Sequence, residues 1–400
     1  MQAARRSGPA RRALSAGSLL RALLDSGPLA RSAIARSTGL SPASVTGHSA
    51  DLLSSGLLVE LPVTSGPNGV GRPRVPLDLN TAVGVVGGIH FAVKHATVAL
   101  LDIRGRVLTS RSLRHDGADP DTVISRSADM LEQLLQQPGM PPRLLGIGVA
   151  SGGWVDRLAG MIVDHGMLGW QRVSVAPRLQ RCFGVPAYLD SHARSLARAE
   201  QLFGHPRSRE SVLLLFVGNV VETAFAMGDQ VHYGPRSRAG AIAHLPVQGS
   251  AECCACGRVG CLEATVSGHR LVSRAHQAGI IARPQMAGLI SAAVAGDRRA
   301  RYLFRERAQV IGAAIGPIID VMSPALVSVV EPGTARVPGC LAVLRRSIGD
   351  ASVTVAHPEQ LVTVTSFSGA ALATAAGAVI LDAIYRDPLG LVPPRAGHVA

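Results

Sequence analysis

The feature that most constrains this chain is a segment rich in cysteine and glycine that runs from His244 to Glu263. It ends in the run Cys254-Ala255-Cys256-Gly257-Arg258-Val259-Gly260-Cys261-Leu262-Glu263. Three thiols lie within eight residues, and a histidine lies ten residues before the first of them, so the segment holds the four ligands of a tetrahedral metal site. The glycines let the backbone fold back on itself. This spacing makes a tetrahedral zinc site of three cysteines and one histidine feasible.

Two alternatives stay open for this segment. The cysteines are either zinc ligands or small reduced side chains buried in a core loop, and Cys253 is a spare thiol that would compete as a ligand. A loop that contains Gly257 and Gly260 offers little apolar burial to so many thiols, which favours the metal. Four protein ligands leave no open position for water, so we expect a structural zinc and not a metal hydrolase.

Composition indicates a folded protein of two or three domains, because the 400 residues are 47% hydrophobic. The formal net charge of +13 favours a polyanionic partner, although Lys94 is the only lysine and the charge is nearly all arginine. No run approaches about 18 apolar residues, and the basic N-terminus lacks an apolar signal segment. We therefore expect a cytoplasmic protein without a membrane partner.

The first 80 residues have the pattern of a DNA-binding module. Residues 1–12 contain four arginines among small residues, which predicts a flexible basic arm that either touches phosphates or is solvated. Helical spacing of apolar residues predicts helices over 13–26 and 31–37, and Ser41-Pro42 opens a third helix that ends at Gly56. A strand over 56–60, a glycine-rich turn over 64–74 and a return strand over 75–79 follow. This order predicts a winged helix-turn-helix domain over 13–79.

In such a domain the start of the third helix faces the base edges of the major groove, and the wing reaches the backbone or the minor groove. The candidate DNA contacts are Ser41, Ala43, Ser44, Thr46, Gly47 and His48 on the helix, and Arg72 and Arg74 on the wing. A structural three-helix module for dimerisation is the alternative; a small, polar face without a pattern of salt bridges favours DNA. A set without Arg, Asn or Gln makes few bidentate base contacts, so the wing and arm are expected to supply much of the affinity.

After Asn80 the pattern changes to strands that alternate with helices. Apolar strands are predicted over 82–88, 96–102 and 144–150, with a hairpin into a further strand near 107 and a helix over 120–137. The later half repeats this theme, with strands over 212–218, 221–227 and 325–330, helices over 265–320, and a helix over 369–384. We therefore predict two α/β lobes around a ligand cleft, lobe 1 over 80–193 and lobe 2 over 194–400, with the C-terminal segment free to return to lobe 1.

These residues resemble a known family. The segment over 254–263 resembles the Cys-x-Cys-Gly-x-x-Gly-Cys-x-Glu signature of the ROK family (repressors, open reading frames, kinases), and the front resembles the winged helix of its regulators, down to Gly71-Arg72-Pro73. Weaker likenesses follow in the family's order, at Val85–Val107, Ser151–Asp156, Leu168-Gly169-Trp170, Gly184-Val185-Pro186 and Gly377-Ala378. The resemblance implies a two-lobed α/β fold of the actin and hexokinase type, zinc on His244, Cys254, Cys256 and Cys261, and a sugar site beside them.

The chain departs from the sugar kinases of that family at the catalytic base. Those kinases carry an Asn-Asp pair after the strand that follows Gly-x-Pro, and here Ser191-His192 stand in its place. Asp190 lies two positions early, which moves a strand-end side chain by about 7 Å, beyond hydrogen-bond reach of the sugar hydroxyl. His192 is a weaker candidate for a base. We therefore predict no catalytic residue.

The phosphate-binding segments depart as well. The kinases' Asp-x-Gly-Gly-Thr loop is Val85-Val86-Gly87-Gly88-Ile89 here, their Gly-Thr-Gly is Gly218-Asn219-Val220, and a late Gly-Gly is Glu331-Pro332. A carboxylate and a proline ring would repel or block a nucleotide. Phosphoryl transfer depends on positioning and charge neutralisation, so we expect no ATP binding.

The sugar side is partly kept. By the resemblance, Glu263 stands where a glutamate hydrogen-bonds sugar hydroxyls, whereas the glutamate of the Gly-Glu-Ile-Gly-His segment is Ala241. The candidate effector contacts are Glu263, His244, Ser191 and His192. We predict a DNA-binding regulator of carbohydrate-related genes, most simply a repressor, that forms a homodimer or homotetramer on double-stranded operator DNA and answers to a sugar or sugar phosphate. A remodelled sugar kinase and a regulator whose lobes bind no effector are the alternatives.

Overall fold

The computed structural model describes residues 8–62 and 75–393, and its first part is a small helical head. The head consists of α1 (Gly8–Ser26), β1 (Leu29–Ala30), α2 (Arg31–Thr38), α3 (Pro42–Ser54), β2 (Leu58–Glu60) and β3 (Pro76–Leu79), and its strands form an antiparallel sheet in the order β1-β3-β2. The predicted start of α3 is confirmed: Ser41 Oγ accepts a hydrogen bond from Ser44 N at 3.1 Å, and Pro42 occupies the first turn. The predicted wing over 64–74 lies outside the described residues.

The predicted basic arm is wrong for residues 8–12. These residues form the first turns of α1, and Arg12 pairs with Asp51 of α3, with 2.7 Å between guanidinium and carboxylate. Arginine and alanine have high helix propensity, so a run of arginines among small residues continues a helix when a carboxylate lies within reach. Residues 1–7 of the predicted arm lie outside the described part.

Two five-stranded sheets with the same topology follow the head, which bears out the predicted α/β fold with a repeated theme. Lobe 1 has the order β11-β7-β4-β5-β6 and lobe 2 the order β16-β15-β12-β13-β14. In each, the first strand pairs antiparallel with the second and parallel with the fourth. The strands of lobe 1 are β4 (Val85–Phe91), β5 (His95–Leu101), β6 (Val107–Arg114), β7 (Leu144–Ser151) and β11 (Ala187–Ser191); those of lobe 2 are β12 (Ser211–Val217), β13 (Val221–Met227), β14 (Gln230–Val231), β15 (Leu326–Val330) and β16 (Val362–Val364).

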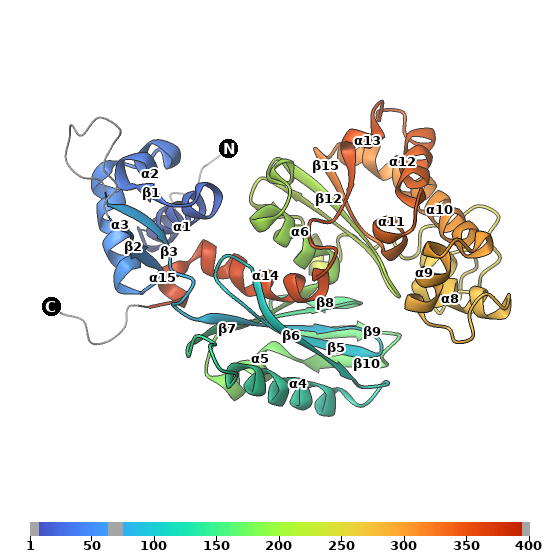
Figure 1. Cartoon of the computed structure of the whole chain (residues 1–400), viewed down its shortest axis with the longest axis horizontal. Coiled ribbons are helices and arrows are strands. Elements are labelled where there is room, and N and C mark those ends of the chain that lie inside the picture. Colours follow the sequence, from blue (N-terminus) through green and yellow to red (C-terminus); the bar gives the residue numbers. More distant parts are fainter. Residues whose placement is uncertain (1–7, 63–74, 394–400) are drawn as a thin grey trace.

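Helices cover both faces of these sheets. The outer layers contain α4 (Pro120–Leu135) and α5 (Ala176–Phe183) in lobe 1, and α7 (Leu262–Val266), α8 (Gly268–Gln277), α9 (Met286–Val294), α10 (Arg298–Met322), α11 (Pro332–Arg336), α12 (Cys340–Ala351) and α13 (Pro358–Leu361) in lobe 2. The inner layer, between the sheets, is α6 (His192–Phe203) and α14 (Ala371–Arg386) (Figure 1). β12 alternates accordingly, because Leu213 and Leu215 pack outward and Val212 and Leu214 pack inward. A sheet of β8 (Trp154–Asp156), β9 (Met161–His165) and β10 (Trp170–Ser174), which the sequence reading missed, extends lobe 1.

Helix α14 connects the three parts of the molecule. It returns from lobe 2 to lie on β4 and β7 of lobe 1, where a Cβ on Gly148 would overlap the carbonyl oxygen of Ala376. Its far end packs against α1 of the head, where a Cβ on Gly17 would overlap the carbonyl oxygen of Tyr385. α15 (Pro388–Leu391) continues this contact, and head and α14 share one hydrophobic cluster. No helix in the described ranges is long and apolar enough to cross a membrane.

Candidate functional site

The structure brings the four predicted metal ligands together. Their ligand atoms all lie within 4.8 Å of one another, with 3.6 Å between Cys254 Sγ and His244 Nδ1 and 3.7 Å between Cys256 Sγ and Cys261 Sγ. Bonds of about 2.3 Å to sulfur and about 2.0 Å to nitrogen on a tetrahedral zinc give edges of about 3.8 Å for two sulfurs and about 3.5 Å for sulfur and nitrogen. The cluster therefore has the dimensions of a metal site.

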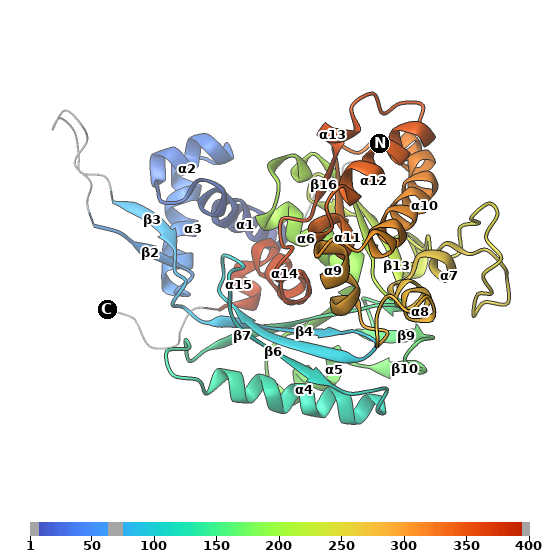
Figure 2. The same cartoon turned by 45° about the vertical axis from the view of Figure 1, so that its right-hand side comes forward.

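Short backbone hydrogen bonds shape the metal loop, residues 244–263, which projects from the edge of lobe 2 (Figure 2). Cys254 and Gly257 close a tight turn, with Gly257 N donating to Cys254 O at 2.9 Å and φ of 86° at Gly257. Gly260, with φ of 77°, reverses the chain again, so that Cys261 pairs with Pro246. Both glycines occupy the left-handed region that side chains disfavour, which explains the Cys-Gly-x-x-Gly-Cys spacing.

The thiols differ in their surroundings. Arg258 donates to Cys256 and lowers the pKa of that thiol to about 6, so a thiolate is available at neutral pH. Cys261 is buried at the start of α7. Cys253 is exposed and is not one of the four clustered residues, so its side chain lies apart from the site.

A second polar site lies between the lobes at the N-terminus of α6, and we call it the interlobe site. Ser191 is the N-cap of α6, where its side chain accepts from Arg194 N at 3.4 Å. Asp190 accepts from Arg194 Nε at 2.6 Å, and both side chains are at most 4% exposed. Asp190 is therefore held in a buried ion pair and not free as a base, as its early position predicted.

His192, the other predicted residue of this site, belongs to a cluster of three buried histidines. Its ring stacks on His90 of β4 with centroids 4.4 Å apart, and its Nε2 lies 3.2 Å from Phe91 O. A Cβ on Gly152 would lie 3.1 Å from His192 and 3.2 Å from His165. Burial lowers the pKa of His90 to about 3 and lowers the pKa values of His192 and His165, so the rings are neutral at pH 7. Four of their nitrogens have no partner among the described residues: both nitrogens of His90, Nε2 of His165 and Nδ1 of His192.

Two glutamates complete the interlobe site. Glu263 accepts from Val221 N at 2.9 Å, and burial raises its pKa. Glu222, which the sequence reading missed, accepts from Gly153 N at 3.1 Å and Ala193 N at 3.4 Å, joining lobe 1 to α6. Burial raises the pKa of Glu222 to about 7, against the influence of Arg194. The signal that could have found it is an acid two residues after the Gly218-Asn219-Val220 segment. His244 belongs to the metal cluster, and within the described part of the chain it has no hydrogen bond to Ser191, His192, Glu222 or Glu263.

The segments that resemble phosphate loops have structural partners instead. A Cβ on Gly88 would lie 3.0 Å from Gly377 N, so this glycine allows α14 to approach the sheet. Glu331 forms a buried ion pair with Arg307, 2.6 Å between Oε1 and Nη1, with both side chains 3% exposed. Arg307 also donates to Val217 O at 3.2 Å, immediately before Gly218. Arg307 thereby links the segment at Gly218 to the segment at Glu331.

The predicted DNA contacts on α3 lie in its N-terminal half and are all at least partly exposed. Ser41, Ala43, Thr46 and Gly47 are exposed and Ser44 and His48 are half-buried. Ser44 and Thr46 use their hydroxyls within the helix, Ser44 towards Ser41 at 2.9 Å and Thr46 towards Pro42 O at 2.9 Å. Arg72 and Arg74 lie outside the described residues. Arg36, exposed in the last turn of α2, was not predicted.

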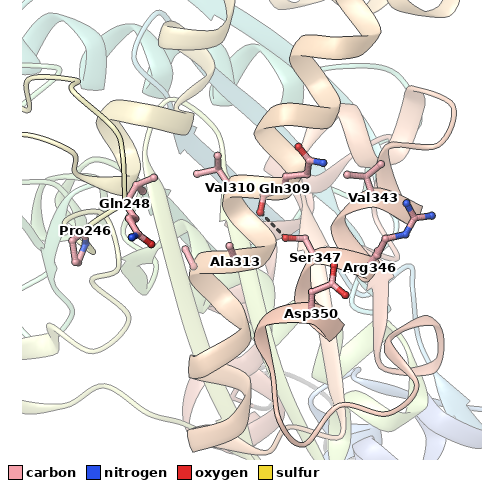
Figure 3. Close-up of a pocket in the computed structure, with 11 residues that line it drawn as sticks. Pro246, Gln248, Gln309, Val310, Ala313, Val343, Arg346, Ser347 and Asp350 are labelled. Atoms are coloured by element: carbon pink, nitrogen blue, oxygen red, sulfur yellow. Dashed lines mark hydrogen bonds between the residues drawn. The ribbon is translucent and has the colours of Figure 1, made fainter.

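The described surface also has two pockets away from the predicted effector residues. One, of about 630 Å³, lies between α10, α12 and the base of the metal loop, where Ser347 Oγ donates to Gln309 O at 2.7 Å (Figure 3). The other, of about 480 Å³, lies where α1 meets α6 and α14, and Arg21, Asp25, Asp382 and Arg386 line it. None of the four predicted effector residues lines either pocket.

Comparison with known proteins decides the family. The model of the ROK family matches residues 86–383, which is most of the chain. The chain belongs to the ROK family. A transcriptional regulator of Mycobacterium tuberculosis is 32% identical over 94% of this chain and 86% of its own length. A xylose repressor of Caldicellulosiruptor bescii is 25% identical over 77% of this chain and 80% of its own. The solved structure of a ROK family transcriptional regulator, a homolog of the Escherichia coli Mlc protein, superposes with a TM-score of 0.79 at 22% identity and covers 96% of this chain and 99% of that one. That ROK structure bears out the predicted fold.

Proposed function

We propose that this ROK protein is a DNA-binding transcriptional regulator, most simply a repressor of carbohydrate-related genes, whose lobes have lost kinase chemistry. The observation that carries the proposal is the free face of α3 in a head attached to a ROK body. Ala43, Thr46 and Gly47 are small, exposed and close to the positive N-terminal end of the helix, where a groove can accept them. Arg36 on α2 adds a cation suited to a phosphate beside that face.

Selection of bound fragments from genomic DNA tests this proposal. The full chain is expected to enrich fragments that share one sequence with two half-sites, because the protein is proposed to act as a homodimer or a homotetramer. Ala43→Asp places a carboxylate on the DNA-facing surface and should abolish enrichment. Ala159→Asp, an equally exposed change in lobe 1, is the matched control and should leave enrichment intact. Enrichment that is independent of sequence, or that survives Ala43→Asp, would count against the proposal.

The metal in this proposal is one structural zinc on His244, Cys254, Cys256 and Cys261. The donor set of three thiolates and one imidazole suits zinc, and four protein ligands complete its coordination. A metal there would hold the loop against α7 and so would brace the segment that ends in Glu263. Elemental analysis of the purified protein is expected to give one zinc per chain.

The effector in this proposal is a sugar or sugar phosphate that reaches the interlobe site. Glu263, Ser191 and the neutral histidines, His192 among them, offer acceptors and donors for hydroxyl groups. Helix α6 would carry the signal, because it begins at that site and ends at the head, where Arg21 of α1 donates to Gln201 O. Along the helix, Arg198 pairs with Asp382 of α14 at 2.8 Å. We expect Arg198→Gln to keep DNA binding but to lose the response to the ligand, measured by fluorescence anisotropy with and without that ligand.

The second candidate function is a sugar kinase, and such an enzyme would release ADP from ATP when a sugar is present. We expect no such turnover, because Glu331, which replaces the first glycine of the late segment, is paired with Arg307 of α10, and because Asp190 is engaged by Arg194. A coupled assay of ADP release over a panel of hexoses and N-acetylhexosamines tests this. Sugar-dependent turnover that disappears in His192→Ala would replace the regulator proposal with the kinase.

A further inference from the structure

A group of arginines lies beside the interlobe site and takes no part in the contacts described above. We call it the arginine rim: Arg157 of lobe 1 and Arg236 and Arg238 of lobe 2, with the rings of Trp154 and Tyr233. Arg238 Cζ lies 3.7 Å from the ring centroid of Trp154, and Arg157 Cζ lies 5.0 Å from that of Tyr233. Each lobe therefore places an arginine on an aromatic ring of the other lobe.

The rim has an excess of positive charge. Within residues 8–62 and 75–393, none of the three rim arginines has a carboxylate within ion-pair distance. Arg236 and Arg238 are exposed and Arg157 is half-buried. Stacking on an aromatic face holds a guanidinium in place but leaves its charge unneutralised, and such cations attract anions.

A buried arginine beside the rim, Arg194, also favours an anionic ligand. The side chain of Arg194 is 4% exposed, and its Cζ lies 5.5 Å from the ring centroid of Tyr233. Nε is held by Asp190, and Nη1 donates to Ser237 O at 3.1 Å, whereas Nη2 has no hydrogen-bond partner among the described residues. A buried guanidinium nitrogen without an acceptor is costly, and a ligand oxygen would satisfy it.

The backbone of the rim is held in an unusual conformation. Arg236 and Ser237 both have φ of 56°, although neither is a glycine. Trp154 Nε1 donates to Arg236 O at 3.0 Å and Arg194 donates to Ser237 O, so side chains from both lobes fix the two strained residues. Strain of about 1–3 kcal/mol per residue is retained where surrounding contacts over-determine it, which is typical of ligand-binding segments.

We infer that the arginine rim binds the phosphate group of a phosphorylated sugar and so joins lobe 1 to lobe 2 when that ligand is bound. The inference rests on the proposed function, because it places the sugar ring at the interlobe site. Gly153 and Arg194 connect that site to the rim: Gly153 precedes Trp154 and donates to Glu222, and Arg194 contacts both Asp190 and Ser237. A phosphate monoester offers three acceptor oxygens, which suits several guanidinium groups at once. Glu222, the carboxyl joined to Gly153, is partly protonated at neutral pH because burial raises its pKa, and it adds little repulsion.

Pairs of ligands that differ only in the phosphate test the inference. The full chain is titrated with hexose, pentose and N-acetylhexosamine phosphates, with each parent sugar and with inorganic phosphate, by thermal shift and calorimetry. At least one sugar phosphate is expected to raise the melting midpoint, and to bind at least 10-fold more tightly than its parent sugar and than inorganic phosphate. Arg157→Gln and Arg238→Gln are expected to weaken it by about 10-fold each. Arg126→Gln, an exposed arginine on α4, is the matched control and should not change binding.

Several results would overturn the inference. They are equal binding of parent sugar and sugar phosphate, equal binding of inorganic phosphate, unchanged binding in both rim variants, or no stabilisation by any phosphate. The midpoint of each unliganded variant shows that it is folded. DNA binding of the same preparation is measured separately, so that its loss counts against the regulator and a failure of phosphate binding alone counts against the rim.

Discussion

The metal loop of lobe 2 and the interlobe site meet at Glu263, but they differ in what holds them together. In the metal loop, four ligand side chains converge within 4.8 Å, and most of the residues around them are exposed. In the interlobe site, the carboxylates already have partners of their own: Asp190 has Arg194, and Glu222 has Gly153 N and Ala193 N. Four histidine nitrogens and Arg194 Nη2 have none among the described residues.

This difference separates family features that depend on a bound group from those that the protein's own side chains hold in place. Three of the four clustered side chains of the loop are exposed or half-buried, so packing contributes less to their arrangement than a metal would. The places that resemble phosphate and base segments have been filled by ion pairs, stacked rings and helix contacts, and they can stand without a ligand. We therefore expect changes in the loop to act through metal, and changes between the lobes to act through packing, charge and pH.

Removing a thiol from the loop should have the largest effect. Cys256→Ser is expected to lose the zinc and to lower the free energy of unfolding by several kcal/mol, because structural zinc sites have apparent binding free energies of about 10–16 kcal/mol. Metal content and denaturant unfolding measure this. The matched control is Cys253→Ser. Cys253 directly precedes the predicted ligand Cys254 but is not one of the four clustered residues. Full zinc content in Cys256→Ser, or its loss in Cys253→Ser, would contradict the assignment of ligands.

Breaking the buried ion pair between Arg307 and Glu331 should have the next largest effect on the free energy of unfolding. Arg307→Met leaves Glu331 as a buried, unpaired carboxylate and is expected to cost about 3–5 kcal/mol in unfolding experiments, while zinc content stays at one per chain. Replacing both partners, with Arg307→Met and Glu331→Leu, should recover much of that loss. A single variant that keeps its stability and gains ATP binding would show that the pair blocks a working nucleotide site.

The pH dependence of stability should be a smaller effect and should come from the interlobe site. His90, His165 and His192 have lowered pKa values in the folded chain, so the unfolded chain takes up their protons first, and stability falls as pH decreases below about 6.5. Glu222 acts in the opposite direction, because its raised pKa, about 7, makes the folded chain hold a proton that the unfolded chain releases above about 4.5.

Urea unfolding between pH 5 and pH 8 measures the balance of these groups. The three histidines outnumber the two carboxyls of the interlobe site whose pKa values burial raises, Glu222 and Glu263, so we expect lower stability at pH 5 than at pH 7. Glu222→Gln should steepen that decline and raise stability at pH 8 by about 1–3 kcal/mol, because the buried charge is removed. If stability in this range does not depend on pH, or if Glu222→Gln lowers it at pH 8, the histidines and Glu222 are not buried as described.

The sequence predicted correctly those features that depend on residues close together along the chain. The cap at Ser41, the strand over 221–227 and the spacing of the metal ligands all depend on residues within a few turns of one another, and the structure has each of them. Glu222, His90 and the arginine rim escaped prediction because their partners lie in other strands and helices. The prediction of an arm was wrong for 8–12, because these residues continue α1, and Arg12 there pairs with Asp51, 39 residues away along the chain. Arg307 and Glu331 are 24 residues apart, so the pair appears only in the fold.

We propose above all that the head reads DNA while the ROK lobes do no kinase chemistry. The most direct test of this claim is a fluorescence anisotropy titration of the full chain on a selected fragment and on a shuffled fragment of equal composition, over a range of salt concentrations. We expect at least 10³-fold tighter binding to the selected fragment, with affinity that falls linearly on logarithmic axes as salt increases. Equal affinity for both fragments, at every salt concentration, would contradict the claim.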